Sequence, residues 1–273
     1  MSELVDLVMW TLNSEKTLAR TLSSIEIAIP DKYVNQKIIV DGNSEDRTKE
    51  IGESFGWRII NTNKRGIGKQ GNIALGLVET EVFASFEHDV ILSPSWFTSI
   101  RPQIEKPDVA VVQGIRLPTN PVMRAIERYR IKRKRRYTSI DNNLYRTKII
   151  KELGGFNSLY LSYVDRELRD RVEKAEYRWL VDRTVISEHI RPSLTDYVRH
   201  VDKLALLKSY PEGNQTKDNF VRLLFSPIRG LHIALDQRCP KAFLAYPYWL
   251  LWNVKTVTQI KYDFFGDEKR EEK

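Results

Sequence analysis

Two carboxylates stand two residues apart, directly after an apolar run. Residues 82–86 read VFASF, and Glu87, His88 and Asp89 follow them. Alternate side chains of an extended chain point to the same side, so Glu87 and Asp89 can face one ion. Carboxylate oxygens suit Mg²⁺ or Mn²⁺, and such an ion neutralises the charge that develops on a leaving phosphate. Two simpler roles stay open: Asp89 could cap a helix that starts near Ser93, and Glu87 could pair with a lysine.

Polar residues also stand where two other strand-like runs stop. Thr11 and Asn13 follow the apolar residues 4–10, and Asp41 ends the β-branched run KIIVD. Asp41 could accept hydrogen bonds from a nucleobase or ribose, or it could only cap the following helix. Lys69 opens a helix-like segment, where it could meet a phosphate beside the helix N-terminus or simply lie on the surface.

Alternating strand-like and helix-like segments must position these side chains. Strands are predicted over residues 4–10, 37–41, 57–62 and 82–87, and helices over 14–25, 44–56 and 68–79. Ser14 is predicted to be the N-cap of the first helix. This order argues for an α/β fold with a mostly parallel sheet covered on both faces, in which ligands bind beyond the carboxyl ends of the strands. The three polar stretches should therefore gather on one rim.

The middle of the chain continues the pattern less regularly. A strand is predicted over 108–117, a turn at Gly154–Gly155, a helix over 163–179 and a strand over 180–190. Residues 124–136 form a cationic segment, with eight Lys/Arg against one Glu in a chain of net charge +8. Such a segment implies phosphates, a lipid surface or nucleic acid as partner, unless it is only a solvated helix face. It lacks the interleaved aromatics of a stacking platform, so we expect no nucleic-acid partner.

The composition changes after Pro192. Prolines break aromatic, apolar stretches, and the longest uncharged run, residues 242–254, has 13 residues. A spanning helix needs about 20 residues, so this run is too short to cross a bilayer. It could form helices packed on the rest of the chain, or amphipathic helices in the membrane interface, which its Tyr and Trp residues and the Lys/Arg on both sides favour. The single cysteine, Cys239, and a start without a signal-peptide core favour a reducing, cytoplasmic location.

Six stretches, in this order, resemble family 2 glycosyltransferases with the GT-A fold, over about residues 4–190. They are VMWTLNSEKTLARTLSSI, IIVDGNSEDRT, GIGKQGNIALG, FASFEHDVILSPSW, LGGF and VDRELRDRV. The resemblance implies transfer of a sugar from a nucleotide-diphosphate sugar, with inversion at the anomeric carbon. Three positions depart from the family's pattern: Glu87 replaces the first Asp of the D-x-D motif, Gly42-Asn43 replaces Asp-Gly, and Val164 replaces an acid.

The resemblance also implies roles for single residues. Asp41 would contact the base, and Asp89 would bind the metal with Glu87 nearer the ribose and the metal shell. His189 would be a further metal or diphosphate ligand, although it could also be a satisfied strand-end histidine. The predicted donor site consists of Thr11, Asn13, Asp41, Lys69, Glu87, His88 and Asp89, and the predicted metal ligands are Asp89, His189 and Glu87.

Asp165 matches the family's general base. It would deprotonate a hydroxyl acceptor, whereas a phosphate acceptor is already ionised and needs no base. It could instead be an ordinary helix carboxylate paired with Arg169. The cationic segment lies in the region that commonly borders the acceptor cleft in this family, so we expect Arg133, Arg135 and Arg136 to bind the phosphate of the acceptor.

We therefore expect a GT-A catalytic domain over residues 1–192 and a C-terminal helical, interfacial segment over 193–273. The spacing resembles small archaeal or bacterial membrane-associated members, which implies a peripheral or monotopic enzyme on the cytoplasmic face of the membrane. It would move a hexose from GDP-mannose or UDP-glucose to a polyprenyl or dolichyl phosphate, or to a glycan built on such a lipid, with Mn²⁺ or Mg²⁺ as cofactor. The alternative is a soluble glycosyltransferase that acts on a free glycan or a small molecule.

Overall fold

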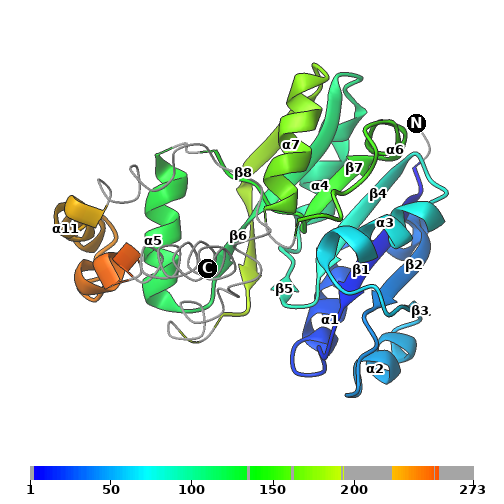
Figure 1. The fold of residues 1–273 in the computed structure, drawn as a ribbon, viewed down its shortest axis with the longest axis horizontal. Coiled ribbons are helices and arrows are strands. Elements are labelled where there is room, and N and C mark those ends of the chain that lie inside the picture. Colours follow the sequence, from blue (N-terminus) through cyan, green and yellow to red (C-terminus); the bar gives the residue numbers. More distant parts are fainter. Residues whose placement is uncertain are drawn as a thin grey trace, which may run out of the picture. The chain divides into compact units, whose positions relative to one another are not determined.

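The part of the chain up to His189 is built around an eight-stranded sheet, with the strand order β3-β2-β1-β4-β7-β6-β8-β5 (Figure 1). The computed structural model describes residues 3–133, 136–160, 163–191, 193, 223–248 and 250–251. The strands are β1 (Val5–Thr11), β2 (Val34–Asp41), β3 (Arg58–Asn61), β4 (Val82–Glu87), β5 (Val90–Ile91), β6 (Val109–Pro118), β7 (Asn143–Arg146) and β8 (Arg178–His189). The α-helices are α1 (Leu18–Ala28), α2 (Thr48–Ser54), α3 (Ile67–Leu77), α4 (Trp96–Ile100), α5 (Pro121–Lys132), α6 (Thr147–Glu152), α7 (Val164–Lys174) and α11 (Ser226–Asp236), and 3-10 helices cover η1 (Asp31–Tyr33) and η2 (Arg101–Glu105).

The strands β1 to β4 form the parallel half of the sheet. β1 lies between β2 and β4, with Thr11 opposite Asp41 and Trp10 opposite Glu87, and β3 pairs with β2. The carboxyl ends of β1, β2 and β4 therefore stand side by side, as the strand order in the sequence predicts. The other half is antiparallel, because β7 pairs with both β4 and β6, and β5 pairs with β8.

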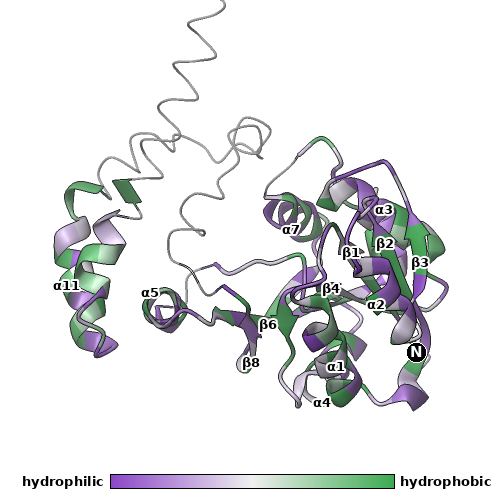
Figure 2. Cartoon of the chain, turned by 90° about the horizontal axis from the view of Figure 1, so that it is seen from below, coloured by the Kyte–Doolittle hydropathy of each residue, from purple (hydrophilic) through white to green (hydrophobic). Residues whose placement is uncertain are grey.

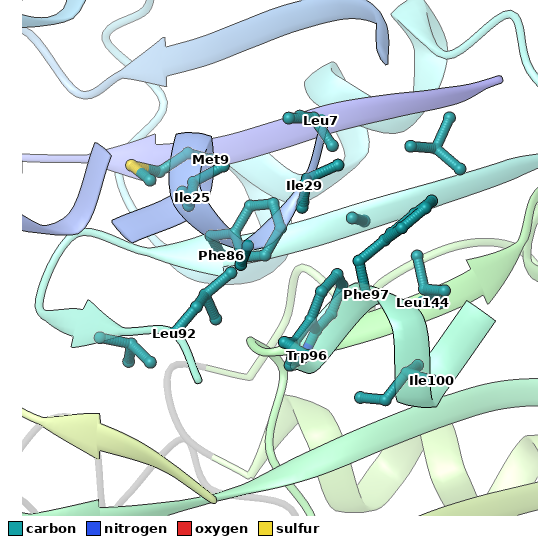
Figure 3. Close-up of a cluster of buried hydrophobic side chains, with 14 of the residues drawn as sticks. Leu7, Met9, Ile25, Ile29, Phe86, Leu92, Trp96, Phe97, Ile100 and Leu144 are labelled. Atoms are coloured by element: carbon teal, nitrogen blue, oxygen red, sulfur yellow. The ribbon is translucent and has the colours of Figure 1, made fainter. Parts of the chain in front are cut away.

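Helices cover both faces of the sheet because its central strands bury side chains on both sides. On one face, Leu7 and Phe86 of the sheet pack with Ile25 of α1 and Trp96 of α4 (Figure 3). Phe86 and Trp96 meet edge to face, with ring centroids 5.4 Å apart. The core on the opposite face joins α3, α6 and α7 around Tyr145. Two packed cores thus hold β4 rigidly up to the carboxylates at its end.

α3 docks closely against the loop that follows α6. A Cβ on Gly68 would lie 2.4 Å from the carbonyl oxygen of Asn157, so only glycine allows this approach. Asn72 holds the same loop, because its amide donates to the Phe156 carbonyl (2.7 Å) and its oxygen accepts from the Phe156 N–H (2.8 Å). The predicted turn is confirmed, since Gly154–Gly155 have positive φ angles of 86° and 71°.

Two predicted helix ends are wrong by several residues. α1 begins at Leu18, with Thr17 before it, because the carbonyl of Ser14 accepts the N–H groups of both residues in a preceding turn. Ser14 is therefore not the N-cap of α1. α7 ends at Lys174 instead of continuing to 179, because Glu176 takes a left-handed conformation (φ 63°) and the chain then enters β8.

The chain divides into two compact units. Residues 1–117 and 136–190 form the first unit, and residues 118–135 and 191–273 form the second. Within the second unit, α5 packs on α11 and on the helical residues 242–248 through a core that includes Ile126 and Ile233. Among the residues that the structure describes, none of the helices has the length and apolarity that crossing a bilayer requires. The boundary at residue 192 stays a prediction.

Candidate active site

Asp41 organises the loop that follows β2. Its buried side chain accepts hydrogen bonds from the Thr11 hydroxyl (2.8 Å), the Ser44 hydroxyl (2.6 Å) and the Ser44 N–H (2.6 Å). It does not cap α2, which begins at Thr48 with Arg47 before it. Asp41 therefore sets the shape of the rim between β1 and β2, and its contact with a nucleobase stays a prediction.

Asn13 and Gln70 tie the rim together. Asn13 has a left-handed backbone (φ 50°), and its N–H donates to the Ser44 hydroxyl at 2.8 Å. The buried Gln70 side chain, on α3, donates to the carbonyls of Thr11 (3.1 Å) and Val40 (2.9 Å). The predicted donor residues that follow β1 and β2 thus belong to one hydrogen-bonded rim, of which Gln70 is a member that the sequence pattern does not reveal.

His88 is fastened to α1. Its Nδ1 atom lies 2.9 Å from the Thr17 hydroxyl, and its carbonyl accepts from the Thr21 hydroxyl at 2.8 Å. Glu87 and Asp89, on either side of it, instead contact β6 and β8. Residues 88–89 form a turn after β4, so Glu87 and Asp89 come together through this turn and not through an extended strand. A contact between His88 and the donor stays a prediction.

Glu87, Asp89 and His189 converge at one point. Each offers one ligand atom, and these atoms all lie within 4.8 Å of one another. The pairing of β5 with β8 places Val90 opposite His189, which leaves Asp89 Oδ2 3.4 Å from His189 Nε2. Asp89 does not cap α4, which begins at Trp96. Two carboxylates and an imidazole are a donor set that fits Mn²⁺ or Mg²⁺, so the three predicted metal ligands are brought together in a suitable arrangement.

Arg116 and Asp141 lie behind this cluster. Arg116 Nη1 is 2.6 Å from Glu87 Oε2 and 2.7 Å from Asp141 Oδ1, so Glu87 pairs with an arginine and not with a lysine. Asp141 is completely buried. Burial raises the pKa of Asp141 to about 8, an effect that Arg116 opposes and that the charges of Glu87 and Asp89 reinforce. The one sequence signal for this pair is an arginine inside the otherwise apolar strand 109–118.

Asp165 lies half-buried in the first turn of α7. The alternative pairing with Arg169 is not the one seen, because Arg169 donates to Glu173 (2.6 Å) and to the Tyr137 carbonyl (2.9 Å). Burial raises the pKa of Tyr145, and the negative charge of Asp165 adds to this effect, so Asp165 lies within electrostatic reach of the core below the site. Its role as general base stays a prediction.

The residues predicted to bind phosphate groups belong to different elements of the chain. Lys69 is exposed in the first turn of α3. Arg133 belongs to the second unit and covers the ring of Tyr129 at 4.4 Å, whereas Arg136 belongs to the first unit and donates to Asp170 of α7 at 2.5 Å. Arg135 lies outside the described residues. Phosphate binding by these arginines stays a prediction.

Comparison with known proteins identifies the domain. Residues 6–169, well over half of the chain, match the family model described as glycosyl transferase family 2. A search of curated proteins by sequence returns no match.

Solved structures of low sequence identity share the fold. One is the mannosyltransferase PcManGT from Pyrobaculum calidifontis in complex with GDP-Man and Mn²⁺, with a TM-score of 0.59 and 16% identity, over 90% of this chain and 73% of that one. Another is TarS 1–349 from S. aureus in complex with UDP, with a TM-score of 0.53 and 19% identity, over 82% of this chain and 72% of that one. At these identities the likeness shows the fold, which is a GT-A fold.

Proposed function

This chain belongs to glycosyl transferase family 2, and from that premise we propose that it is an inverting hexosyltransferase with a lipid-linked acceptor at a membrane surface. As a member of the family it is a glycosyltransferase that uses a nucleotide-sugar donor. The observation that carries the proposal is the convergence of Glu87, Asp89 and His189 within 4.8 Å, at the carboxyl edge of the sheet.

This cluster would hold Mn²⁺ or Mg²⁺, with Asp89 and His189 as ligands and Glu87 beside them. When bound, the ion supplies positive charge to the diphosphate of the donor, which is the leaving group. The rim around Asp41 would receive the nucleoside, and the exposed Lys69 at the start of α3 would meet the diphosphate. PcManGT is solved with GDP-Man and TarS with UDP, so both GDP-mannose and UDP-glucose are donors to test.

Binding of the donor can be measured by thermal shift with UDP, GDP and their sugars, with and without Mn²⁺. We expect one nucleotide sugar to raise the unfolding temperature only when Mn²⁺ is present, and Asp89→Asn to abolish that rise. The matched control is Asp108→Asn, because Asp108 is an exposed acid of the same unit that pairs with Arg178. A metal-dependent rise that survives in Asp89→Asn would overturn the assignment of the metal site.

Asp165 would take the proton of a hydroxyl acceptor. If the acceptor is a hydroxyl, Asp165→Asn should lower the rate of transfer by roughly 10²–10⁴ while donor binding stays unchanged. A rate close to that of the wild type would instead indicate a phosphate acceptor, which arrives already ionised. Transfer to polyprenyl phosphate and to a lipid-linked sugar, measured side by side, therefore identifies the class of acceptor.

The exposed apolar side chains of the second unit support the proposal that the enzyme works at a membrane surface. Its described helical part exposes the apolar side chains of Leu224, Phe225, Ile228, Leu231, Leu235, Phe243, Leu244, Tyr248 and Leu251. On α11, Gly230, Ile233 and Ala234 are buried, and Ile233 belongs to the core shared with α5, so this helix has one face in the core and apolar side chains outside it. In Figure 2 the ribbon of α11 is coloured green for hydrophobic residues over much of its length, with purple hydrophilic stretches between them. The exposed Arg238 and Lys241 add the positive charge that attracts anionic lipid headgroups.

Vesicle flotation tests this surface directly. The triple variant Ile228→Ser, Leu231→Ser, Leu235→Ser should bind vesicles of anionic phospholipid at least tenfold more weakly than the wild type, because burial of one large apolar side chain contributes about 1.5–3 kcal/mol. The matched control is Ile27→Ser, which changes an equally exposed isoleucine on α1 of the first unit. Unchanged flotation of the triple variant, or a wild type that stays with the soluble fraction, would favour an enzyme that acts on a free glycan.

A further inference from the structure

Arg116 is the cation that holds Glu87. It lies on β6, where its neighbours along the strand are buried apolar residues, and only 23% of its side chain is exposed. A single nitrogen, Nη1, lies 2.6 Å from Glu87 Oε2 and 2.7 Å from Asp141 Oδ1. One oxygen of Glu87 is thereby paired with Arg116, and one carboxylate oxygen of Glu87 lies within 4.8 Å of the ligand atoms of Asp89 and His189.

The three charged residues come from neighbouring strands. Glu87 ends β4, Asp141 lies two residues before the start of β7, and Arg116 lies on β6, and these three strands are adjacent in the sheet. A carboxylate with no exposed surface, like that of Asp141, is costly unless a cation faces it, and Arg116 is that cation. In turn, Asp141 limits the positions that the guanidinium can take.

The segment that carries Asp141 is itself firmly held. The carbonyl of Asp141 accepts from the Ser139 hydroxyl (2.8 Å), and the Asn143 amide donates to the Ser139 carbonyl (2.7 Å). The N–H of Asn142, which has a left-handed backbone (φ 64°), donates to the carbonyl of Ser85 in β4 at 2.9 Å. These hydrogen bonds tie the segment to the strand that ends in Glu87, so Asp141 can act as an anchor for Arg116.

We propose that Arg116 and Asp141 form a positioning pair, in which Asp141 fixes the guanidinium of Arg116 and Arg116 fixes the Glu87 carboxylate toward the metal shared with Asp89 and His189. This inference rests on the proposed function, because the metal is part of it. Neither residue of the pair is one of the three metal ligands.

The two ways in which Arg116 could act predict opposite effects of its removal on the affinity for a divalent cation. If Arg116 acts by charge alone, its removal leaves the cluster more negative, so a divalent cation should bind more tightly. If Arg116 acts by position, its removal frees Glu87 and the cation should bind more weakly, as loss of outer-shell partners typically costs about 10–100-fold in metal affinity. The direction of the change in affinity therefore separates the two.

Mn²⁺ titration of the full chain, followed by electron paramagnetic resonance without any sugar nucleotide, measures this affinity. We expect Arg116→Gln to weaken Mn²⁺ binding about tenfold or more. Because Arg116→Gln leaves Asp141 buried without its cation, the double variant Arg116→Gln/Asp141→Asn removes both ionisable side chains and should weaken binding to the same extent. Arg146→Gln is the matched control, since Arg146 is a partly buried arginine of the same unit whose guanidinium donates to the backbone carbonyls of Ile104, Lys106 and Val109.

The role of Glu87 is tested in the same titration. In a Glu87→Gln background, the double variant Arg116→Gln/Asp141→Asn should cause no further loss of Mn²⁺ affinity, because the carboxylate it positions is already gone. Mn²⁺ binding by the double variant that equals or exceeds that of the wild type overturns the positioning pair and leaves the metal site intact. A wild type that binds no Mn²⁺ overturns both this inference and the metal part of the proposed function.

Discussion

At the scale of single residues, the rim depends on carboxylates that accept several hydrogen bonds. Asp41 accepts from Thr11 and from both the N–H and the hydroxyl of Ser44. Asp41→Asn places an NH₂ group where one of these donors points, so a buried donor loses its acceptor. We expect the free energy of unfolding to fall by about 1–3 kcal/mol, measured by urea denaturation. Asp31→Asn, at a side chain that is 89% exposed, should change it by less than about 0.5 kcal/mol.

Asp182, within β8, also accepts several hydrogen bonds, and we expect it to make the stability of the protein depend on pH. Desolvation alone would raise the pKa of Asp182, but hydrogen bonds from Thr184 and Gln103 outweigh it and lower this pKa below its ordinary value. A lowered pKa in the folded state stabilises the protein above the unfolded pKa, and this contribution is lost as the pH falls through the folded pKa. Asp182→Asn should therefore reduce stability by about 1–2 kcal/mol at neutral pH.

The difference between Asp182→Asn and the wild type should shrink as the pH is lowered below about 4. Chemical denaturation of both proteins over a series of pH values measures it. A difference that stays constant down to the lowest pH at which both proteins fold would show that the charge of Asp182 contributes nothing.

The residues of the cluster differ in how far the sequence predicts them. Glu87 and Asp89 are two apart at the end of an apolar run, which suggests a shared site from local sequence, whereas His189, at the end of a later strand, is assigned to the site through the resemblance to the family. Arg116 and Asp141 could not be paired in this way. Their contact depends on β7 lying between β4 and β6, and that strand order is a tertiary property which no local pattern encodes.

At the scale of elements, the approach of α3 to the loop after α6 gives a matched pair of glycine substitutions. Gly68→Ala would set its Cβ 2.4 Å from a backbone oxygen, so α3 or the loop must shift, and we expect a loss of about 1–3 kcal/mol in stability. Gly76→Ala, on the same helix, meets nothing within 4 Å and should stabilise the protein by about 0.5–1 kcal/mol. Thermal unfolding of both variants measures the contrast, and a stabilising Gly68→Ala would disprove the close approach.

The elements themselves were predictable where the hydrophobic period is strong. The alternation of strands and helices up to β4 is confirmed, because β1 and β4 are buried on both faces and helices such as α1 and α3 bury an apolar face. The start of α1 and the end of α7 were not predictable in this way. A turn at Ser14 sets the first, and the left-handed conformation of Glu176 sets the second. β5 has two residues and exists because β8 pairs with it, so its own sequence carries little signal.

At the scale of the whole molecule, the two units have separate cores. The core of the second unit consists of residues from α5, α11 and the residues that follow α11, whereas both cores around the sheet consist of residues of the first unit. Ile126→Ala, in the core of the second unit, should lower the stability of that unit by about 2–5 kcal/mol. The metal-dependent binding of the donor by the first unit should stay unchanged. Val111→Ala, in a core beside the sheet, should reduce both stability and donor binding. Thermal shift with and without the donor measures both, and loss of donor binding in Ile126→Ala alone would contradict independent cores.

The proposed metal ligands come from distant parts of the chain. Asp89 and His189 stand 100 positions apart in the sequence, and the histidine becomes available only when β8 has been made and has paired with β5. During translation, therefore, a growing polypeptide presents the two acids long before their third partner emerges from the ribosome. If the proposed metal binds, it would complete the site only near the end of synthesis of this unit, so metal loading would mark a chain whose first unit is already whole.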